Sequence, residues 1–436
     1  MKLKNLALTA ILGLSTTSFA KVSVNFASED IKEKELIVSF EEGITKEDKE
    51  ALIADQGGVI LKHFKTMNSA LVRIPDTNSM LSTASLIADH TGVIKVGPNR
   101  VFNLLATTTN DPKINKQYHH DNIKSYDAWD ISTGSKDVVV GVIDTGIVLD
   151  HEDLEANLWQ NPGETGTDAN GNDKRTNGID DDGNGYVDDY QGWDFIDGDN
   201  TPNDQHGHGT HCAGLVGAVG SNGTGVAGVN WNVSVVALKI FGGSGSTSEA
   251  AIVEAIEYAN MMGFDITNNS WGGPASGEWG EGGKDVIYEA IKAGGEKGHL
   301  FVFAAGNSGA NSDQKPLIPG AYDLDSILSV AATTSRDGLA NFSNYGVTTV
   351  DIGAPGAGIF STIKRGFFGR QYGNMSGTSM AAPIVTGAAA LVKAVNPSFS
   401  SSEIKEKLMS TADQVNSLKG KTVTGGRLNV YRAITE

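Results

Sequence analysis

Short apolar runs with little alternation recur in the chain beyond residue 130. They cover residues 137–144, 233–241, 299–307 and 327–333. Because they are rich in β-branched residues, they are typical of strands buried on both faces of a sheet. A helical pattern lies in residues 248–263, where Ile252, Ile256 and Ala259 share one face and Gly263 follows the last turn. This alternation predicts an α/β fold with a mostly parallel sheet covered by helices on both faces.

Two segments of a different character precede this pattern. Residues 1–20 carry lysines, a short apolar run and small residues before Ala20, which are features of a secretory signal peptide cleaved after Ala20. Residues 21–105 predict a small α+β domain ahead of a main domain at 106–436. Its strand-like stretches are 35–40, 69–75 and 93–105. No later segment is expected to cross a bilayer, so we expect a soluble, exported protein.

The formal net charge of −18 is concentrated in one place. Residues 164–200 hold 11 acidic residues against Lys174 and Arg175, which is half of the total excess. A basic face for nucleic acid is therefore not expected, and the acidic segment favours cations. The single cysteine, Cys212, excludes an intrachain disulfide, so packing or metal ions must stabilise the exported product.

Three polar positions stand where chemistry is expected in such a sheet. Asp144 ends the first buried run, His208 lies in HGHGTHCAG at 206–214, and Ser379 heads a long apolar helix whose Pro383 fits only near the first turn. Taken alone, each residue has an ordinary structural explanation: Asp144 as a turn former, His208 as a core histidine and Ser379 as a helix cap. Together, Asp, His and Ser in this order fit a nucleophile with its base and orienting acid. Asn307 ends another run, where its amide could donate to an oxyanion.

The histidine-rich segment also has other readings. His206, His208, His211 and Cys212 could bind zinc, although their spacing is borderline for four-coordination. Cys212 could be a thiol nucleophile, but a free cysteine is more often a small buried hydrophobe. A metalloenzyme built on this cluster therefore stays open beside the serine mechanism.

Four segments resemble the motifs of subtilisin-family serine endopeptidases. They are VIDTG at 142–146, HGTHCAG at 208–214, AAGNSG at 304–309 and GTSMAAP at 377–383. The resemblance implies that Asp144 is the orienting acid, His208 the general base, Ser379 the nucleophile and Asn307 the oxyanion donor. It also implies a prosegment at 21–105 that inhibits the enzyme and is removed by self-cleavage between Leu104 and Asn110. An inactive scaffold that binds a partner is the alternative within this family.

The resemblance extends to substrate binding, for which we expect protein or peptide chains. Exposed backbone in a glycine-rich loop, at Gly243, Ser244 and Gly245, is expected to pair with an extended substrate. The walls of the main specificity pocket are expected from Ser270, Trp271 and Gly272 and from Ala304, Ala305 and Gly306. Trp271 stands where many members have leucine, and we expect a preference for apolar or aromatic side chains. Members with a cysteine at the position of Cys212 are sensitive to mercurials, and we expect the same here.

The acidic insertion, residues 164–200, contains a calcium-loop pattern. Asp180, Asp182 and Asn184 stand at its positions one, three and five, and the Tyr186 carbonyl at position seven. Position twelve is Gln191 instead of glutamate, so Asp188 or Asp189 is expected to substitute. A solvated acidic loop is the alternative. By resemblance alone, Asp153 is expected to bind a second structural calcium. The enzyme is expected to be a monomer.

Overall fold

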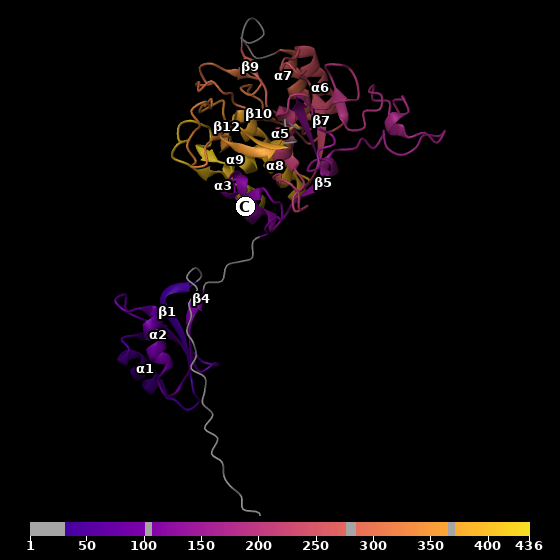
Figure 1. Ribbon diagram of the computed structural model, residues 1–436. Helices are drawn as coiled ribbons and strands as arrows, with labels where there is room; N and C mark the ends of the chain where they lie inside the picture. Colours follow the sequence, from indigo (N-terminus) through magenta and orange to yellow (C-terminus); the bar gives the residue numbers. More distant parts are fainter. Residues whose placement is uncertain (1–30, 101–106, 276–284, 365–370) are drawn as a thin grey trace, which may run out of the picture. The chain divides into compact units, whose positions relative to one another are not determined.

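The computed structural model describes residues 31–100, 107–275, 285–364 and 371–436. The chain divides into two compact units, residues 1–105 and 106–436, which are described separately here (Figure 1). The expected signal peptide and part of the expected self-cleavage region, residues 104–106, lie outside the described residues.

Within residues 31–100, four strands form an antiparallel sheet in the order β2-β3-β1-β4, accompanied by two helices. The elements are β1 (Ile31–Phe40), α1 (Lys46–Asp55), β2 (Val59–Phe64), β3 (Ser69–Arg73), α2 (Met80–Ala88) and β4 (Val93–Arg100). Leu36, Val38 and Phe40 are buried at every second position of β1, so one face of the sheet forms the core of this unit. The α+β character is confirmed. The sequence did not predict β2, because its side chains are mostly exposed or half-buried.

The described part of the larger unit contains a nine-stranded sheet in the order β16-β17-β13-β12-β10-β8-β5-β7-β6. Its strands are β5 (Gly134–Asp144), β6 (Gly192–Asp194), β7 (Asn232–Lys239), β8 (Ile266–Asn269), β10 (Leu300–Ala304), β12 (Ile327–Thr333), β13 (Ile352–Pro355), β16 (Asp413–Gln414) and β17 (Gly426–Arg427). All pairs are parallel except β16 with β17. The predicted mostly parallel sheet is therefore confirmed.

Helices cover both faces of this sheet (Figure 1). They are α3 (His119–Asn122), α4 (Ser125–Trp129), α5 (His208–Gly217), α6 (Glu249–Met261), α7 (Val286–Glu296), α8 (Thr378–Val395), α9 (Ser401–Ser410) and α10 (Val430–Thr435). Short strands β9 (Gly273–Pro274) and β11 (Leu317–Ile318) pair with each other, as do β14 (Ile359–Thr362) and β15 (Tyr372–Met375). In β10, Leu300 and Val302 face the core with α5 and α8, while Phe301 and Phe303 face the core with α6 and α7.

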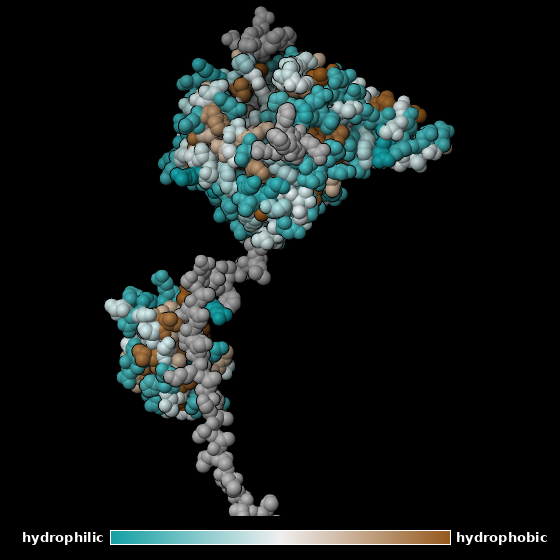
Figure 2. Space-filling view, viewed as in Figure 1, coloured by the Kyte–Doolittle hydropathy of each residue, from teal (hydrophilic) through white to brown (hydrophobic). Residues whose placement is uncertain are grey.

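Helix α8 corrects one expectation from the sequence. Among the described residues, it is long and apolar enough by composition to cross a membrane. However, 78% of it is buried inside the unit, as expected for the core helix of a globular domain. On the face of residues 107–436 that Figure 2 shows, hydrophilic side chains predominate and the apolar areas are small and separate.

Candidate active site

Three neighbouring strands end at one edge of the sheet and carry the polar candidates there. Asp144 is the last residue of β5, Ser270 follows β8, and Asn307 lies three residues beyond β10. Strand β8 pairs with both β5 and β10, so these carboxyl ends are adjacent. Two helices begin with the remaining candidates, because His208 is the first residue of α5 and Ser379 the second residue of α8.

The imidazole of His208 is held by a buried carboxylate. The Oδ1 and Oδ2 atoms of Asp144 lie 2.8 and 2.9 Å from Nδ1 of His208. Asp144 is 1% exposed, and its Oδ1 also accepts a hydrogen bond from the backbone N–H of Thr145 at 2.7 Å. This contact assigns the proton of the neutral ring to Nδ1 and leaves Nε2 as the acceptor.

Burial and charge act in opposite directions on His208. Burial, the largest influence, lowers its pKa, whereas the negative charge of Asp144 and the hydrogen bond to it raise it. The net result is a pKa well above the usual value of 6.5. The surroundings of His208 therefore stabilise its protonated, positively charged form.

A second buried carboxylate, Asp204, fixes the start of α5, although none of the sequence motifs described above includes it. It accepts hydrogen bonds from the backbone N–H groups of His206, Gly207 and Thr210 at 2.8, 2.8 and 3.0 Å. It also accepts from the hydroxyl of Thr145 at 2.9 Å, which ties the end of β5 to the helix carrying His208. An aspartate four residues before a helix start is the signal that could have revealed this role.

Ser379 is positioned by a break in the hydrogen bonds of α8. Pro383 has no N–H, so the carbonyl four residues earlier, that of Ser379, loses its helical partner. The hydroxyl of Ser270 donates to this carbonyl at 2.9 Å, and Sγ of Cys212 lies 3.4 Å from it. The Ser379 hydroxyl itself donates to the carbonyl of Ser270 at 3.3 Å. The Ser379 hydroxyl is therefore directed at Ser270 and not at His208. Hydrogen bonds between a nucleophile and its base often form only when substrate is bound.

Cys212 packs between the candidate base and the candidate nucleophile. Its Sγ is 4.0 Å from Nδ1 of His208 and 3.6 Å from the hydroxyl of Ser270. It is fully buried, and burial raises its pKa, so the sulfur is a neutral thiol and fits the reading as a small buried hydrophobe. The four residues of the alternative zinc reading do not converge: Nε2 of His211 faces the carbonyls of Ile359 and Gly373. The group that gathers instead is Asp144, His208 and Cys212.

The amide of Asn307 has a fixed orientation. Its Oδ1 accepts hydrogen bonds from the backbone N–H of Thr378 at 2.8 Å and from the hydroxyl of Thr378 at 3.1 Å. With Oδ1 so engaged, the exposed Nδ2 group has no protein acceptor in the described part of the chain. Thr378 directly precedes Ser379, so this donor is held beside the serine.

The expected substrate-binding residues differ in their surroundings. Gly243, Ser244 and Gly245 are exposed, and the Gly245 N–H donates to the Gly242 carbonyl at 2.9 Å in a tight turn. The expected pocket residues, by contrast, adjoin the ends of β8 and β10; they are Ser270, Trp271, Gly272, Ala304, Ala305 and Gly306. Trp271 is 9% exposed and packs edge-on against Phe303, with ring centroids 5.4 Å apart. The Trp271 ring is therefore packed beneath the expected pocket residues.

The calcium-loop pattern folds into a compact turn. Asp180 accepts hydrogen bonds from the backbone N–H groups of Gly183, Asn184 and Gly185 at 2.7, 3.1 and 2.8 Å. The Asp188 oxygens are engaged by the Gly178 N–H, at 3.1 Å each. Asp180 and Asp182 gather with Glu164, a residue the sequence analysis did not select. Carboxylate and carbonyl oxygens are calcium's preferred ligands, so this set fits the ion.

Asp153 is fully buried beside a second loop. Its carboxylate accepts hydrogen bonds from the Asn222 side chain at 2.9 Å and from the Val226 N–H at 2.8 Å. Burial is the main cause that raises its pKa to about 7. A cation at this place would relieve the cost of burying the charge.

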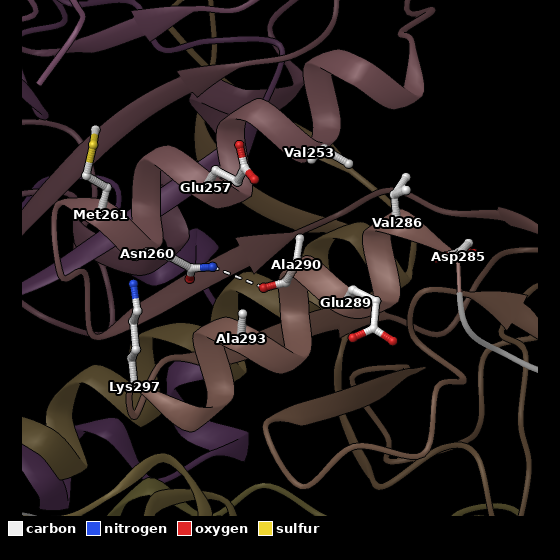
Figure 3. Close-up of a pocket in the computed structure, with 10 residues that line it drawn as sticks. All are labelled: Val253, Glu257, Asn260, Met261, Asp285, Val286, Glu289, Ala290, Ala293 and Lys297. Atoms are coloured by element: carbon white, nitrogen blue, oxygen red, sulfur yellow. Dashed lines mark hydrogen bonds between the residues drawn. The ribbon is translucent and has the colours of Figure 1, made fainter.

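A separate groove of about 640 Å³ lies between α6 and α7 (Figure 3). Glu257, Glu289 and Lys297 line it together with small apolar residues, and Asn260 donates to the Ala290 carbonyl across it at 3.0 Å. It contains none of the candidate catalytic or substrate-binding residues, so it is not the active site.

Comparison with known proteins agrees with this fold. Residues 135–428 match the Subtilase family, and residues 20–99 match the Fervidolysin N-terminal prodomain. The chain is 33% identical to thermitase of Thermoactinomyces vulgaris over 75% of its length and 99% of that protein. It is 29% identical to a thermophilic serine proteinase of Bacillus sp. over 97% of its length and 92% of that protein. A solved protease of Pseudoalteromonas arctica matches with a TM-score of 0.58 at 29% identity, covering 75% of this chain and 99% of that one.

The fold and these matches define a serine endopeptidase made with an N-terminal prodomain. The chain belongs to the subtilase family.

Proposed function

We propose that the chain is a secreted, self-processing endopeptidase in which Ser379 is the nucleophile, His208 the general base and Asp144 the orienting acid. The contact of both Asp144 oxygens with Nδ1 of His208 is the observation that carries this proposal. Since it keeps the ring proton on Nδ1, Nε2 is free to take the proton of the Ser379 hydroxyl. The serine oxygen then attacks the carbonyl carbon of a peptide bond.

Negative charge that develops on the substrate oxygen needs donors near Ser379. Nδ2 of Asn307 and the Ser379 backbone N–H, which lies in the first turn of α8, are suited to this task. His208 returns its proton to the leaving amine, and an acyl-enzyme forms. Water, deprotonated by His208, then releases the new carboxyl terminus and restores Ser379.

The same proposal includes export, a prosegment and structural calcium. The signal-peptide pattern of residues 1–20 supports secretion, and the prodomain match supports residues 21–105 as an inhibitor of this monomeric enzyme. Calcium is proposed at Asp153 and in the insertion. The insertion ligands are Asp180, Asp182, Asn184, the Tyr186 carbonyl and Asp188. Bound there, calcium would neutralise acidic side chains and take no part in the reaction.

Self-processing provides the test. Residues 21–436 are expressed with calcium as wild type, as Ser379→Ala and as Ser376→Ala, and intact masses are recorded over time. Ser376 is an exposed serine close in sequence and serves as the control. We expect the wild type and Ser376→Ala, but not Ser379→Ala, to release a fragment of about 85–90 residues. Release from all three would show that another protease cuts the chain. If none releases it and a fluorophosphonate does not label the wild type, the proposed mechanism is wrong.

A further inference from the structure

Glu164 is a buried carboxylate with one oxygen left over. The residue has 0% exposure, and its Oε1 accepts a hydrogen bond from the backbone N–H of Asp181 at 2.8 Å. Its Oε2 is buried and has no hydrogen-bond partner among the described residues. Such a group is costly to bury unless a cation or donor reaches it.

The side chains around Glu164 are mainly negatively charged, and none of those described brings a cation or a hydrogen-bond donor to its Oε2. One carboxylate oxygen from each of Glu164, Asp180 and Asp182 lies within 4.8 Å of the other two. The nearby cation of Lys174 pairs with Asp181 at 3.8 Å and donates to the Gly163 carbonyl at 3.2 Å. The three gathered carboxylates therefore need a positive charge that the described residues do not bring to them.

The segment that carries Glu164 is built against the calcium-loop pattern. A Cβ atom at Gly163 would lie 2.3 Å from Cβ of Asp182, so only glycine allows this approach. The Asn161 side chain donates to Oδ2 of Asp182 at 2.9 Å and to Oδ1 of Asp189 at 2.6 Å. Residues 161–164 thus form a segment that packs against the loop and fixes the position of the Glu164 carboxylate.

We propose that Glu164 is a calcium ligand that replaces the glutamate missing at position twelve, where the loop has Gln191. In this assignment Glu164 takes the place of Asp188 in the ligand set proposed above. Its Oε2 is buried and free of hydrogen bonds among the described residues, whereas both oxygens of Asp188 and of Asp189 accept hydrogen bonds. Asp188 binds the Gly178 N–H, and Asp189 accepts hydrogen bonds from Tyr258 at 2.5 Å and from Asn184 at 2.9 Å. The ligands thus come from two segments, with the acidic side chain supplied from upstream of the loop. This inference rests on the proposed binding of calcium by the insertion.

Terbium, which replaces calcium and is excited by nearby aromatic rings, provides a direct readout. The Tyr186 ring lies in the loop and 5.1 Å from the Trp193 ring, centroid to centroid. The full chain carrying Ser379→Ala, which prevents self-cleavage, is titrated with terbium alone and then with calcium as competitor. The variants are Glu164→Gln, Gln191→Ala and Glu155→Gln. Glu155 is exposed and removes the same charge outside the cluster, so it is the matched control.

We expect Glu164→Gln to weaken one class of terbium sites by at least about 10-fold, because a charged ligand is lost. Gln191→Ala and Glu155→Gln should bind as the parent chain does. Circular dichroism without metal checks that Glu164→Gln is folded, and Glu164→Asp, which keeps the charge, should bind better than Glu164→Gln. If Glu164→Gln binds like the parent, or if Gln191→Ala is the variant that loses affinity, the assignment of Glu164 is wrong while calcium binding stands. If the parent chain shows no terbium binding, both proposals are overturned.

Discussion

Both carboxylate oxygens of Asp144 lie within hydrogen-bonding distance of Nδ1 of His208, at 2.8 and 2.9 Å. We expect Asp144→Asn to lower kcat for peptide hydrolysis by about 10⁴-fold, because the amide favours the wrong imidazole tautomer. Hydrolysis of a chromogenic peptide, after removal of the prosegment, measures this effect. Asp137→Asn, an exposed residue of the same strand, is the control and should retain activity. Loss of less than tenfold in Asp144→Asn would contradict the assigned role.

The pH dependence of hydrolysis should report His208. Burial lowers its pKa, but the charge of Asp144 and the hydrogen bond to that carboxylate raise it, and the pKa lies well above 6.5. Only the neutral imidazole accepts the serine proton, so kcat/KM should fall as the pH decreases through this raised pKa. The acidic limb is thus expected above pH 6.5, and in Asp144→Asn it should move to lower pH. A wild-type limb centred at or below pH 6.5 would show that the carboxylate does not control the base.

Asn307→Ala removes one proposed oxyanion donor. We expect kcat to fall by about 10²–10³-fold with little change in KM, because the contact forms mainly in the transition state. Ser308→Ala, at the exposed neighbouring position, should behave as wild type. A rise in KM at constant kcat would instead assign Asn307 to substrate binding.

Mercurial reagents test the place of Cys212. Its sulfur lies 3.4 Å from the Ser379 carbonyl oxygen and 4.0 Å from Nδ1 of His208. A mercury atom bound to this sulfur must therefore displace the carbonyl and the imidazole. The wild type should lose activity with a mercurial, whereas Cys212→Ala should be active and resistant. Activity is expected in this variant because the hydroxyl of Ser270 still holds the Ser379 carbonyl. An inactive Cys212→Ala that is folded would point to a direct role for the thiol.

The sequence predicted the fold from patterns that burial on both faces imposes. The runs that became β5, β7, β10 and β12 are mostly apolar, so they were recognised. Strand β8 was not recognised, because its residues, Ile266 to Asn269, are mostly polar even though all are buried. Asn268 satisfies its amide inside the protein, because it donates to the Ser270 hydroxyl at 3.0 Å and accepts from the Thr386 hydroxyl at 3.2 Å. No pattern of hydrophobic positions reveals such a strand.

The residues of the candidate sites also fall into two groups, those that sequence motifs indicated and those that they did not. Asp144, His208, Asn307 and Ser379 lie in short motifs next to predicted strands or helices, so sequence alone selected them. Asp204 and Glu164 act through contacts with backbone N–H groups, and Glu164 lies 16 residues before Asp180. Their importance depends on burial and on chain reversal, which single-sequence patterns do not specify.

A buried ion pair next to the candidate active site should contribute to stability, because Lys239 is the register partner of Asp144 on the neighbouring strand. Lys239, at the end of β7, donates to Oδ2 of Asp194, at the end of β6, and the residues are 2% and 1% exposed. We expect Asp194→Ala to lower the free energy of unfolding by about 3–5 kcal/mol, because it leaves a buried charge unpaired. Denaturant unfolding of the calcium-saturated Ser379→Ala chain measures this. Glu436→Gln, in an exposed pair with Arg432, should cost less than about 1 kcal/mol.

Helix α8 begins at the proposed nucleophile and continues through the middle of the protein, where most of its residues have no contact with solvent. The proposed nucleophile is therefore attached to a helix with little free surface, so most substitutions along this helix would disturb the packed interior. The exposed turn at 243–245, expected to bind substrate, carries no such constraint. Recognition in that turn can therefore vary while the support of the serine stays the same.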